Sequence, residues 1–257
     1  MTDGGAILAD PVAEAARMLR AAEARGVVLR LVGGIAIRMR APSVAGLLPR
    51  RDYHDIDLAC PAGSAASLTE LLADLGYEAS RRFNTMNGHE RLLYWDPVNG
   101  RRVDVFLDVL RMCHQLPFRD RLTVDPGTLP LADLLLTKLQ IVQLTERDGQ
   151  DVCALLADHA LADDDAGGIA LPRIVALCSG DWGWWRTVTG NLDQLVAEWR
   201  DEATAGPPGQ RDVIERAAGR AADLRARLDA APKTARWRIR AALGDRRPWY
   251  ELPEEIR

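Results

Sequence analysis

The segment "DIDLAC" at residues 55–60 constrains the fold more than any other stretch of the chain. Its length and its apolar residues predict a short, partly buried β-strand. Successive side chains of a strand point to opposite faces, so Asp55 and Asp57 must share one face. Two like charges held side by side in a protected place repel each other and call for a counter-ion. That counter-ion is either a neighbouring arginine or a metal ion.

Two glycines and a further aspartate flank this strand in the sequence. An apolar, β-branched run at residues 27–32 predicts a preceding strand, and Gly33-Gly34 separates it from a helix-like segment. Glycine lets backbone N–H groups approach a phosphate at the start of a helix, although a tight turn would use the same residues. Asp104 follows in "RVDVFL", a second predicted strand. There it either faces solvent or joins the first two carboxylates.

The remaining periodicity divides the chain into two parts. Strands are expected on both sides of "PVNG", because Asn-Gly is a strong hairpin turn signal, and Ser64 is expected to cap a helix over 64–76. From Leu131 onward the pattern is almost wholly helical. We therefore expect an α+β chain with a first domain at residues 1–127 and an all-helical domain at residues 128–257. Helices are expected at 11–24, 131–146, 148–160, 172–179, 181–203, 208–230 and 232–243.

Composition limits the surroundings and partners of the chain. No apolar run is long enough to span a membrane, and the N-terminal residues lack the basic and apolar regions of a signal peptide. The four cysteines, none of them in a CxxC pair, are typical of reduced thiols, so we expect a cytoplasmic protein without membrane contact. The net charge of −4 argues against a general nucleic-acid coat. Residues 211–247 nevertheless carry 11 basic and 5 acidic side chains.

The order of these features resembles the nucleotidyltransferase (DNA polymerase β-like) superfamily: a strand, Gly-Gly and a helix, then the paired aspartates, then the third aspartate. The resemblance covers the first half of the chain and implies a mixed sheet flanked by helices. It implies that Asp55, Asp57 and Asp104 hold two Mg²⁺ ions, with Mn²⁺ as an alternative, around a nucleoside triphosphate. It further implies that Gly33 and Gly34 bind the β- and γ-phosphates and that Asp104 is the general base.

The second half resembles one branch of that superfamily. "LADLLLTKLQIVQLTERDGQDVCALL" (131–156) is similar to the region after the core in AbiEii-type enzymes of abortive-infection and toxin–antitoxin systems. Lys138, one of only two lysines beside 31 arginines, matches a helical lysine of that family and is implied to be catalytic and to bind the nucleotide. It could also be a solvated helix charge. Arg147 matches a later basic position, and Asp151 either orients Arg147 or is a surface acid.

Two positions before the first carboxylate depart from the usual pattern of the superfamily. The superfamily often has Gly-Ser where this chain has Gly33-Gly34, and residues 41–54 make the distance to Asp55 longer than usual. Arg51, four residues before Asp55, is a further candidate contact for the nucleotide. The longer segment is either a substrate loop or an elaborated turn.

The resemblance implies an enzyme that transfers a nucleoside monophosphate from an NTP to an acceptor hydroxyl and releases pyrophosphate. A toxin-type enzyme would modify RNA such as tRNA and would have a cognate antitoxin, whereas a resistance-type enzyme would modify a small hydroxylated compound. The basic stretch at 211–247 favours RNA, but an amphipathic helix with a wet basic face explains it equally well. The alternative of another class is a catalytically silent module that binds a nucleotide or a partner protein.

Overall fold

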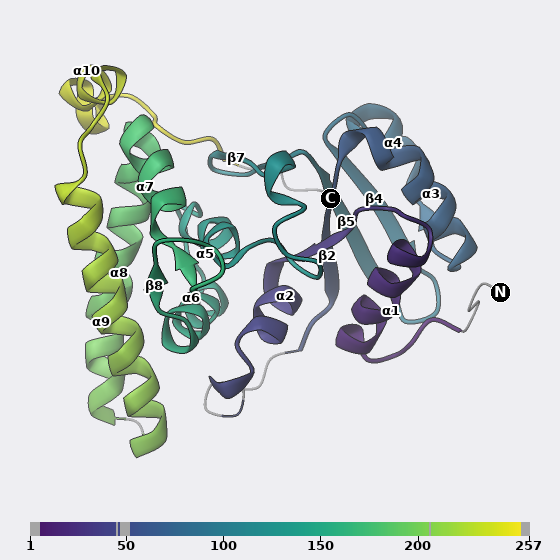
Figure 1. Ribbon diagram of the computed structural model, residues 1–257, viewed down its shortest axis with the longest axis horizontal. Helices are drawn as coiled ribbons and strands as arrows, with labels where there is room; N and C mark the ends of the chain where they lie inside the picture. The colour runs from purple at the N-terminus through teal and green to yellow at the C-terminus, as the bar shows by residue number, and fades with distance from the viewer. Residues whose placement is uncertain (1–5, 45, 47–51, 206, 253–257) are drawn as a thin grey trace. The chain divides into compact units, whose positions relative to one another are not determined.

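A computed structural model describes residues 6–44, 46, 52–205 and 207–252 (Figure 1). Its described residues form two compact units. Unit 1 lies within Met1–Met39, Arg51–Leu110 and Pro117–Pro130, and unit 2 lies within Arg40–Arg50, Arg111–Leu116 and Leu131–Arg257. Two of the boundaries between the units fall within short strands that pair with each other, β6 (Val109–Arg111) and β7 (Gln115–Pro117).

Unit 1 contains a five-stranded mixed sheet. Its strand order is β1-β2-β5-β4-β3, in which only the central pair, β2 and β5, is parallel. The strands are β1 (Arg30–Val32), β2 (Asp55–Cys60), β3 (Glu78–Ala79), β4 (Arg91–Asp96) and β5 (Arg101–Leu107). The helices of the unit are α1 (Pro11–Ala24), α2 (Gly33–Arg40), α3 (Ala65–Asp74) and α4 (Arg81–Asn87), with short 3-10 turns η2 (Ala62–Ser64) and η3 (Arg119–Arg121).

The central strands bury their apolar side chains completely. Ile56 and Leu58 of β2 and Val103 and Val105 of β5 are inaccessible to solvent. Asp55 is exposed and Asp57 is half-buried, so β2 alternates along its first half as the sequence predicts. This arrangement fixes which face of β2 carries the two carboxylates.

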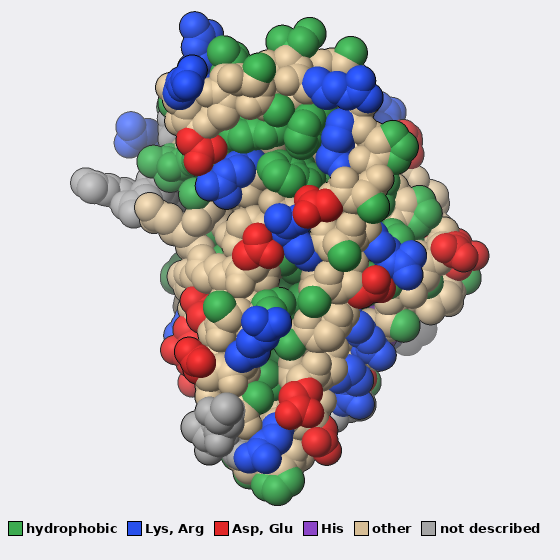
Figure 2. All heavy atoms as spheres, turned by 90° about the vertical axis from the view of Figure 1, so that its left-hand side faces the viewer, with side chains coloured by type: hydrophobic (Ala, Val, Ile, Leu, Met, Phe, Trp, Pro, Cys, Tyr) green, Lys and Arg blue, Asp and Glu red, His purple; other side chains and the backbone are tan. Residues whose placement is uncertain are grey.

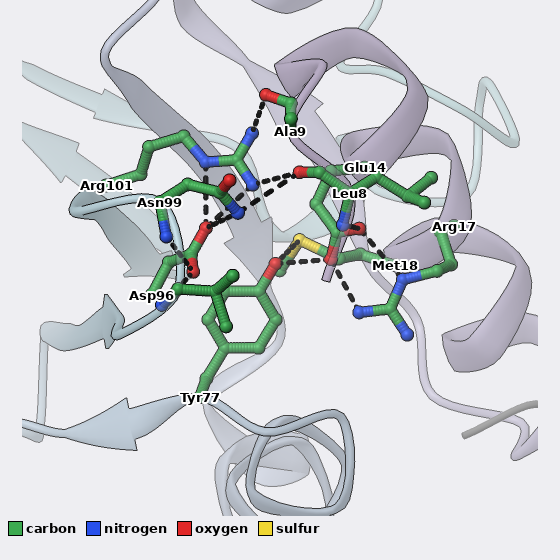
Figure 3. Close-up of polar contacts among 10 residues, drawn as sticks. Leu8, Ala9, Glu14, Arg17, Met18, Tyr77, Asp96, Asn99 and Arg101 are labelled. Atoms are coloured by element: carbon green, nitrogen blue, oxygen red, sulfur yellow. Dashed lines mark hydrogen bonds and ion pairs between the residues drawn. The ribbon is translucent and has the colours of Figure 1, made fainter. Parts of the chain in front are cut away.

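Two buried polar clusters hold the N-terminal segment against the sheet (Figure 3). Glu14 of α1 accepts hydrogen bonds from the Nε atom of Arg17 at 2.8 Å and from the Tyr77 hydroxyl at 2.5 Å. Arg101 donates to Asp96 at the start of the predicted "PVNG" turn and to the carbonyl oxygen of Leu8 at 2.6 Å. Buried carboxylates require such partners, because an unpaired charge is costly in the interior.

Unit 2 is built mainly from helices. They are α5 (Leu131–Leu139), α6 (Glu146–Asp158), α7 (Leu171–Gly180), α8 (Trp182–Ala205), α9 (Pro208–Ala230) and α10 (Ala235–Leu243), with 3-10 turns η1 (Pro42–Val44) and η4 (Gly244–Arg246). The long helices α8 and α9 pack side by side (Figure 1). Two-residue strands β8 (Leu161–Ala162) and β9 (Ile169–Ala170) pair in parallel. No helix in the described ranges is long and apolar enough to cross a membrane.

Several expected boundaries differ from the structure. The helix expected over 131–146 ends at Leu139, and α6 begins at Glu146 behind a capping box formed by Thr145 and Asp148. Ser64 stands at the N-cap position of α3 as expected, but its side chain makes no capping hydrogen bond. The strand expected over 27–32 is shorter, and α4 and β3 were not expected.

Candidate functional site

The strand register brings the sequence-predicted residues of unit 1 together. Asp57 of β2 is the register partner of Asp104 on the parallel strand β5. Partners on neighbouring strands point to the same face of a sheet, so these two carboxylates and Asp55 share one face. Val32 of β1 is in turn the antiparallel partner of Asp57, so the chain enters Gly33 directly beside this carboxylate.

Gly33 is the residue that makes this close approach possible. Its φ of 66° lies in the left-handed region, which glycine adopts without the penalty that other residues incur. A β-carbon at this position would overlap Oδ2 of Asp57. Glycine is therefore required twice here, once for the backbone turn and once for the space beside the carboxylate. Gly34 follows it in the buried first turn of α2.

Asp104 has arginine counter-ions. Its carboxylate is completely buried, and its Oδ1 atom lies 2.8 Å from Nε and 2.7 Å from Nη2 of Arg91 on β4. Nε of Arg102 lies 2.8 Å from Oδ2, a charge contact that is not aligned as a hydrogen bond. Arg102 also reaches Asp55, with Nη2 3.6 Å from Oδ2. In the structure, the counter-ions of Asp104 and Asp55 are thus arginines.

Sequence reasoning did not single out these two arginines. Arg102 lies two residues before Asp104 on the same strand, so the strand period alone would have placed both side chains on one face. Arg91 comes from the neighbouring strand, where Leu93 is the register partner of Asp104. Its position could be found only after the register of the "PVNG" hairpin was known.

Two features of Asp57 and Asp104 are compatible with a cation bound by their carboxylates. Oδ2 of Asp104 is buried without a hydrogen bond, and the absence of a β-carbon at Gly33 lets the carboxylate of Asp57 lie against the start of α2. Carboxylate oxygens are the ligands that Mg²⁺ prefers. As their side chains stand, no three His, Cys, Asp or Glu residues of the described chain are grouped so that they could hold a metal ion.

Lys138 of unit 2 is held by two aspartates. Its Nζ atom lies 3.0 Å from Oδ1 of Asp148 and 2.9 Å from Oδ2 of Asp151, both on α6. Burial lowers the pKa of the ammonium, but the two carboxylates outweigh burial and raise it above its usual value. Lys138 and Asp151 are both largely buried, so neither a solvated lysine nor a surface acid describes them.

The nucleotide contacts predicted for the basic residues remain predictions. Lys138 is engaged with α6, and Arg147 is exposed near the start of the same helix. Arg51 lies outside the described residues.

Known proteins provide no match to this chain. No protein-family model, no curated protein and no solved structure is similar to it.

Proposed function

We propose that unit 1 has a nucleotidyltransferase fold and transfers a nucleoside monophosphate from an NTP to an acceptor hydroxyl, as in enzymes of the AbiEii type. One observation carries the proposal: Gly33 packs directly against Asp57, and Asp57 is in register with Asp104. A glycine turn at a helix start and paired strand carboxylates are the two elements that a metal-bound triphosphate requires. We call Gly33, Gly34, Asp55, Asp57 and Asp104 the acid–glycine site.

Each residue of the acid–glycine site has a role in this reaction. Two Mg²⁺ ions held by Asp55, Asp57 and Asp104 would neutralise the phosphates and favour ionisation of the acceptor hydroxyl. The amides of Gly33 and Gly34, at the start of α2, bind the triphosphate. Asp104 accepts the proton of the acceptor hydroxyl. The acceptor oxygen then bonds to the α-phosphorus, the α–β bridging bond breaks, and pyrophosphate leaves.

We propose RNA as the acceptor, on the basis of the surface of α10. Arg236 and Arg238 on this helix, and Arg246 and Arg247 after it, are exposed. Their side chains make no ion pair or hydrogen bond with any other residue that the structure describes. Figure 2 shows the side of the molecule that lies on the left in Figure 1. Lys and Arg side chains lie at its upper end, where Figure 1 places α10. Free, clustered guanidinium groups are suited to contacts with a phosphate backbone.

A small cationic acceptor is the second candidate, and a groove in unit 2 favours it. The groove lies between α6, α8 and α9, has a volume of about 590 Å³, and is lined by Glu146, Glu198, Glu202 and Trp199. Burial, together with repulsion from Glu198 and Glu146, raises the pKa of Glu202. Gln150 and Gln194, which are neutral, donate hydrogen bonds to Glu146 and Glu198. This uncompensated negative charge suits a hydroxylated compound with amino groups.

The experiment uses each labelled NTP with Mg²⁺ and either total RNA or a panel of aminoglycosides. Transfer to RNA supports the first acceptor, and transfer to an aminoglycoside supports the second. Asp57→Asn should lower transfer at least about 100-fold, which corresponds to about 2.7 kcal/mol, and should keep the fold because it removes a like charge. Asp120→Asn, an exposed aspartate of the same unit, is the matched control. Wild-type turnover in Asp57→Asn would contradict the proposal, and no transfer with any acceptor would leave only a binding module.

A further inference from the structure

The buried Asp104 carboxylate is covered by a partly exposed arginine, Arg91. Asp104 is inaccessible to solvent, whereas the Arg91 side chain is 28% exposed. The guanidinium therefore lies between the carboxylate and water. A cation at Oδ2 of Asp104 would share one carboxylate with the guanidinium of Arg91 at Oδ1, where the two positive charges repel each other.

We infer that Arg91 is a latch on the acid–glycine site, which holds Asp104 in the resting protein and releases it when metal and nucleotide bind together. The inference rests on the proposed function, because it concerns the same carboxylates. Arg91 is a positioning residue in this scheme: it acts on the site through Asp104 and competes with the cation for that side chain.

The surroundings of Arg91 define one closed position for it. The guanidinium carbon lies 4.9 Å from the ring centre of Phe106 and 5.9 Å from that of Phe83 on α4. Aromatic faces attract a cation at these distances. Two nitrogen atoms of the guanidinium converge on one oxygen, Oδ1 of Asp104. Aromatic contacts and a charge-assisted contact thus hold the same group, which makes it an effective competitor for the carboxylate.

Arg102 adds a weaker contact. Its side chain is more exposed than that of Arg91, its Nε is not aligned with Oδ2 of Asp104, and its Nη2 is 3.6 Å from Asp55. Arg102 bridges two of the predicted metal ligands, so a cation displaces it from both. Because its contacts are longer or poorly aligned, we expect its removal to change cation binding less than removal of Arg91.

A released arginine gains more from a new anionic partner than from water. The phosphates of an NTP would bring one to the acid–glycine site, and a planar guanidinium binds phosphate oxygens well. The latch therefore predicts coupling between the two ligands. The cation alone should bind weakly, because it has to break the Arg91–Asp104 contact without replacing it. The cation with an NTP should bind more tightly, because the triphosphate takes over the guanidinium.

The test is calorimetric titration of the full chain with Mn²⁺, without nucleotide and then with a non-hydrolysable NTP analogue. Arg91→Met removes the charge and keeps the apolar stem, and should tighten Mn²⁺ binding without nucleotide by about tenfold, or roughly 1.4 kcal/mol. The same variant should lose most of the nucleotide-dependent gain. Arg102→Met should show a smaller change in the same direction. Arg82→Met, an exposed arginine on α4, should match the wild type.

Melting curves establish that each variant is folded. If Arg91→Met does not fold, Arg91→Gln, which keeps a hydrogen-bond donor, takes its place. If a folded Arg91 variant binds Mn²⁺ no more tightly than the wild type, the latch is wrong. The proposed function is still supported in that case if the wild type binds Mn²⁺ and Asp57→Asn does not. If neither the wild type nor the Arg91 variant binds Mn²⁺, the proposed function fails and the latch fails with it.

Discussion

Asp104 in unit 1 and Lys138 in unit 2 are both buried charges held by two partners of opposite sign, but their partners are held in different ways. The partners of Asp104 are arginines on β4 and β5, and their side chains are 28% and 36% exposed. The partners of Lys138 are Asp148 and Asp151, whose side chains are 13% and 7% exposed. Asp148 is further tied into the capping box of α6 with Thr145.

This difference separates an ion pair that can exchange from one that cannot. An arginine that leaves Asp104 can be hydrated at once, because its side chain is partly exposed. Asp104 itself stays buried, so the exchange costs little only when another cation takes the place of the arginine. A buried aspartate that loses Lys138 keeps a desolvated charge, which is far more costly. The first arrangement suits a site that binds and releases ligands. The second suits a joint between two helices, α5 and α6.

The largest expected effect follows from breaking the joint. Lys138→Met leaves two largely buried carboxylates without their shared cation, and we expect it to cost about 3–5 kcal/mol of unfolding free energy. The melting temperature should fall by roughly 10 °C or more, measured by calorimetry. Arg147→Met, an exposed neighbour on α6, should melt like the wild type. The double variant Lys138→Met/Asp151→Asn should recover part of the loss, because it removes one of the two buried carboxylates that Lys138 neutralises.

The matched change in unit 1 is Asp104→Asn, which should cost only about 1–2 kcal/mol because both arginines can turn to water. An equal loss in Asp104→Asn and Lys138→Met would contradict the difference between the two arrangements. Transfer activity of Lys138→Met, measured where the variant is folded, tests the catalytic role predicted for this lysine from the sequence.

Lowering the pH should reduce the unfolding free energy through one group in each unit, and the two groups should act in different pH ranges. Burial, opposed only by the charge of Asp181, lowers the pKa of His114 in unit 2 to about 4. The neutral imidazole lies 2.8 Å from the Thr187 hydroxyl and against the ring of Trp184. An unfolded histidine titrates near pH 6.5, so the stability due to this group is complete above that pH and is lost as the pH falls toward 4. Between pH 8 and pH 5 we expect a loss of about 2 kcal/mol.

In unit 1, Glu14 is the corresponding group. Burial would raise the pKa of its carboxyl, but hydrogen bonds from Arg17, Tyr77 and the Leu8 amide outweigh burial and lower it. Its contribution is therefore complete above about pH 4.3, the unfolded value, and is lost only as the pH falls further. Urea unfolding of the wild type between pH 8 and 5 reports on His114, and urea unfolding of His114→Gln between pH 5 and 3 reports on Glu14. His114→Gln should remove the loss between pH 8 and 5, whereas the exposed His89→Gln should not; no difference between them would refute the assignment.

The parts of the fold that depend on neighbouring residues could be predicted from the sequence. Asp10 caps α1 and Pro11 stands in its first turn, and the predicted bounds of this helix are correct. The bounds of β2 are also correct, because its alternation and its flanking residues are local signals. The expectation of one shared site for β2, Gly33 and Asp104 came from the order of these motifs and its resemblance to a known superfamily, since the parallel pairing of β2 with β5 is not a local signal.

The remaining boundaries depend on residues far away in the sequence. The apolar periodicity continues beyond Leu139, but the Asn191 side chain donates to the carbonyl oxygens of Leu139 and Ile141 at 2.8 Å. It thereby satisfies backbone groups that a longer helix would have paired internally. In the same way, Oδ1 of Asp108 accepts the Ala62 N–H before α3, where Ser64 was expected to act. No local pattern contains such partners.

The smallest expected effect on stability concerns Arg236 and Arg238 of α10, which differ from the arginines of unit 1 because their side chains have no partner among the described residues. Arg240 of the same helix donates to the carbonyl oxygens of Gly244 and Arg247, so it serves as an internal control. Arg236→Gln/Arg238→Gln should change the unfolding free energy by less than about 0.5 kcal/mol, as exposed substitutions usually do.

The effect of Arg236→Gln/Arg238→Gln on RNA should be larger than its effect on folding. Two lost phosphate contacts should reduce the slope of log K against log salt by roughly 1.4 where they fall on single-stranded RNA and by roughly 1.8 where they fall on a duplex. Filter binding to tRNA from 50 to 300 mM salt measures this slope. Arg240→Gln should leave the slope unchanged and lower the melting temperature, because its guanidinium holds the end of α10. If the double variant kept the wild-type slope, RNA would not bind at this helix, and the acidic groove with a cationic acceptor would become the better-supported alternative.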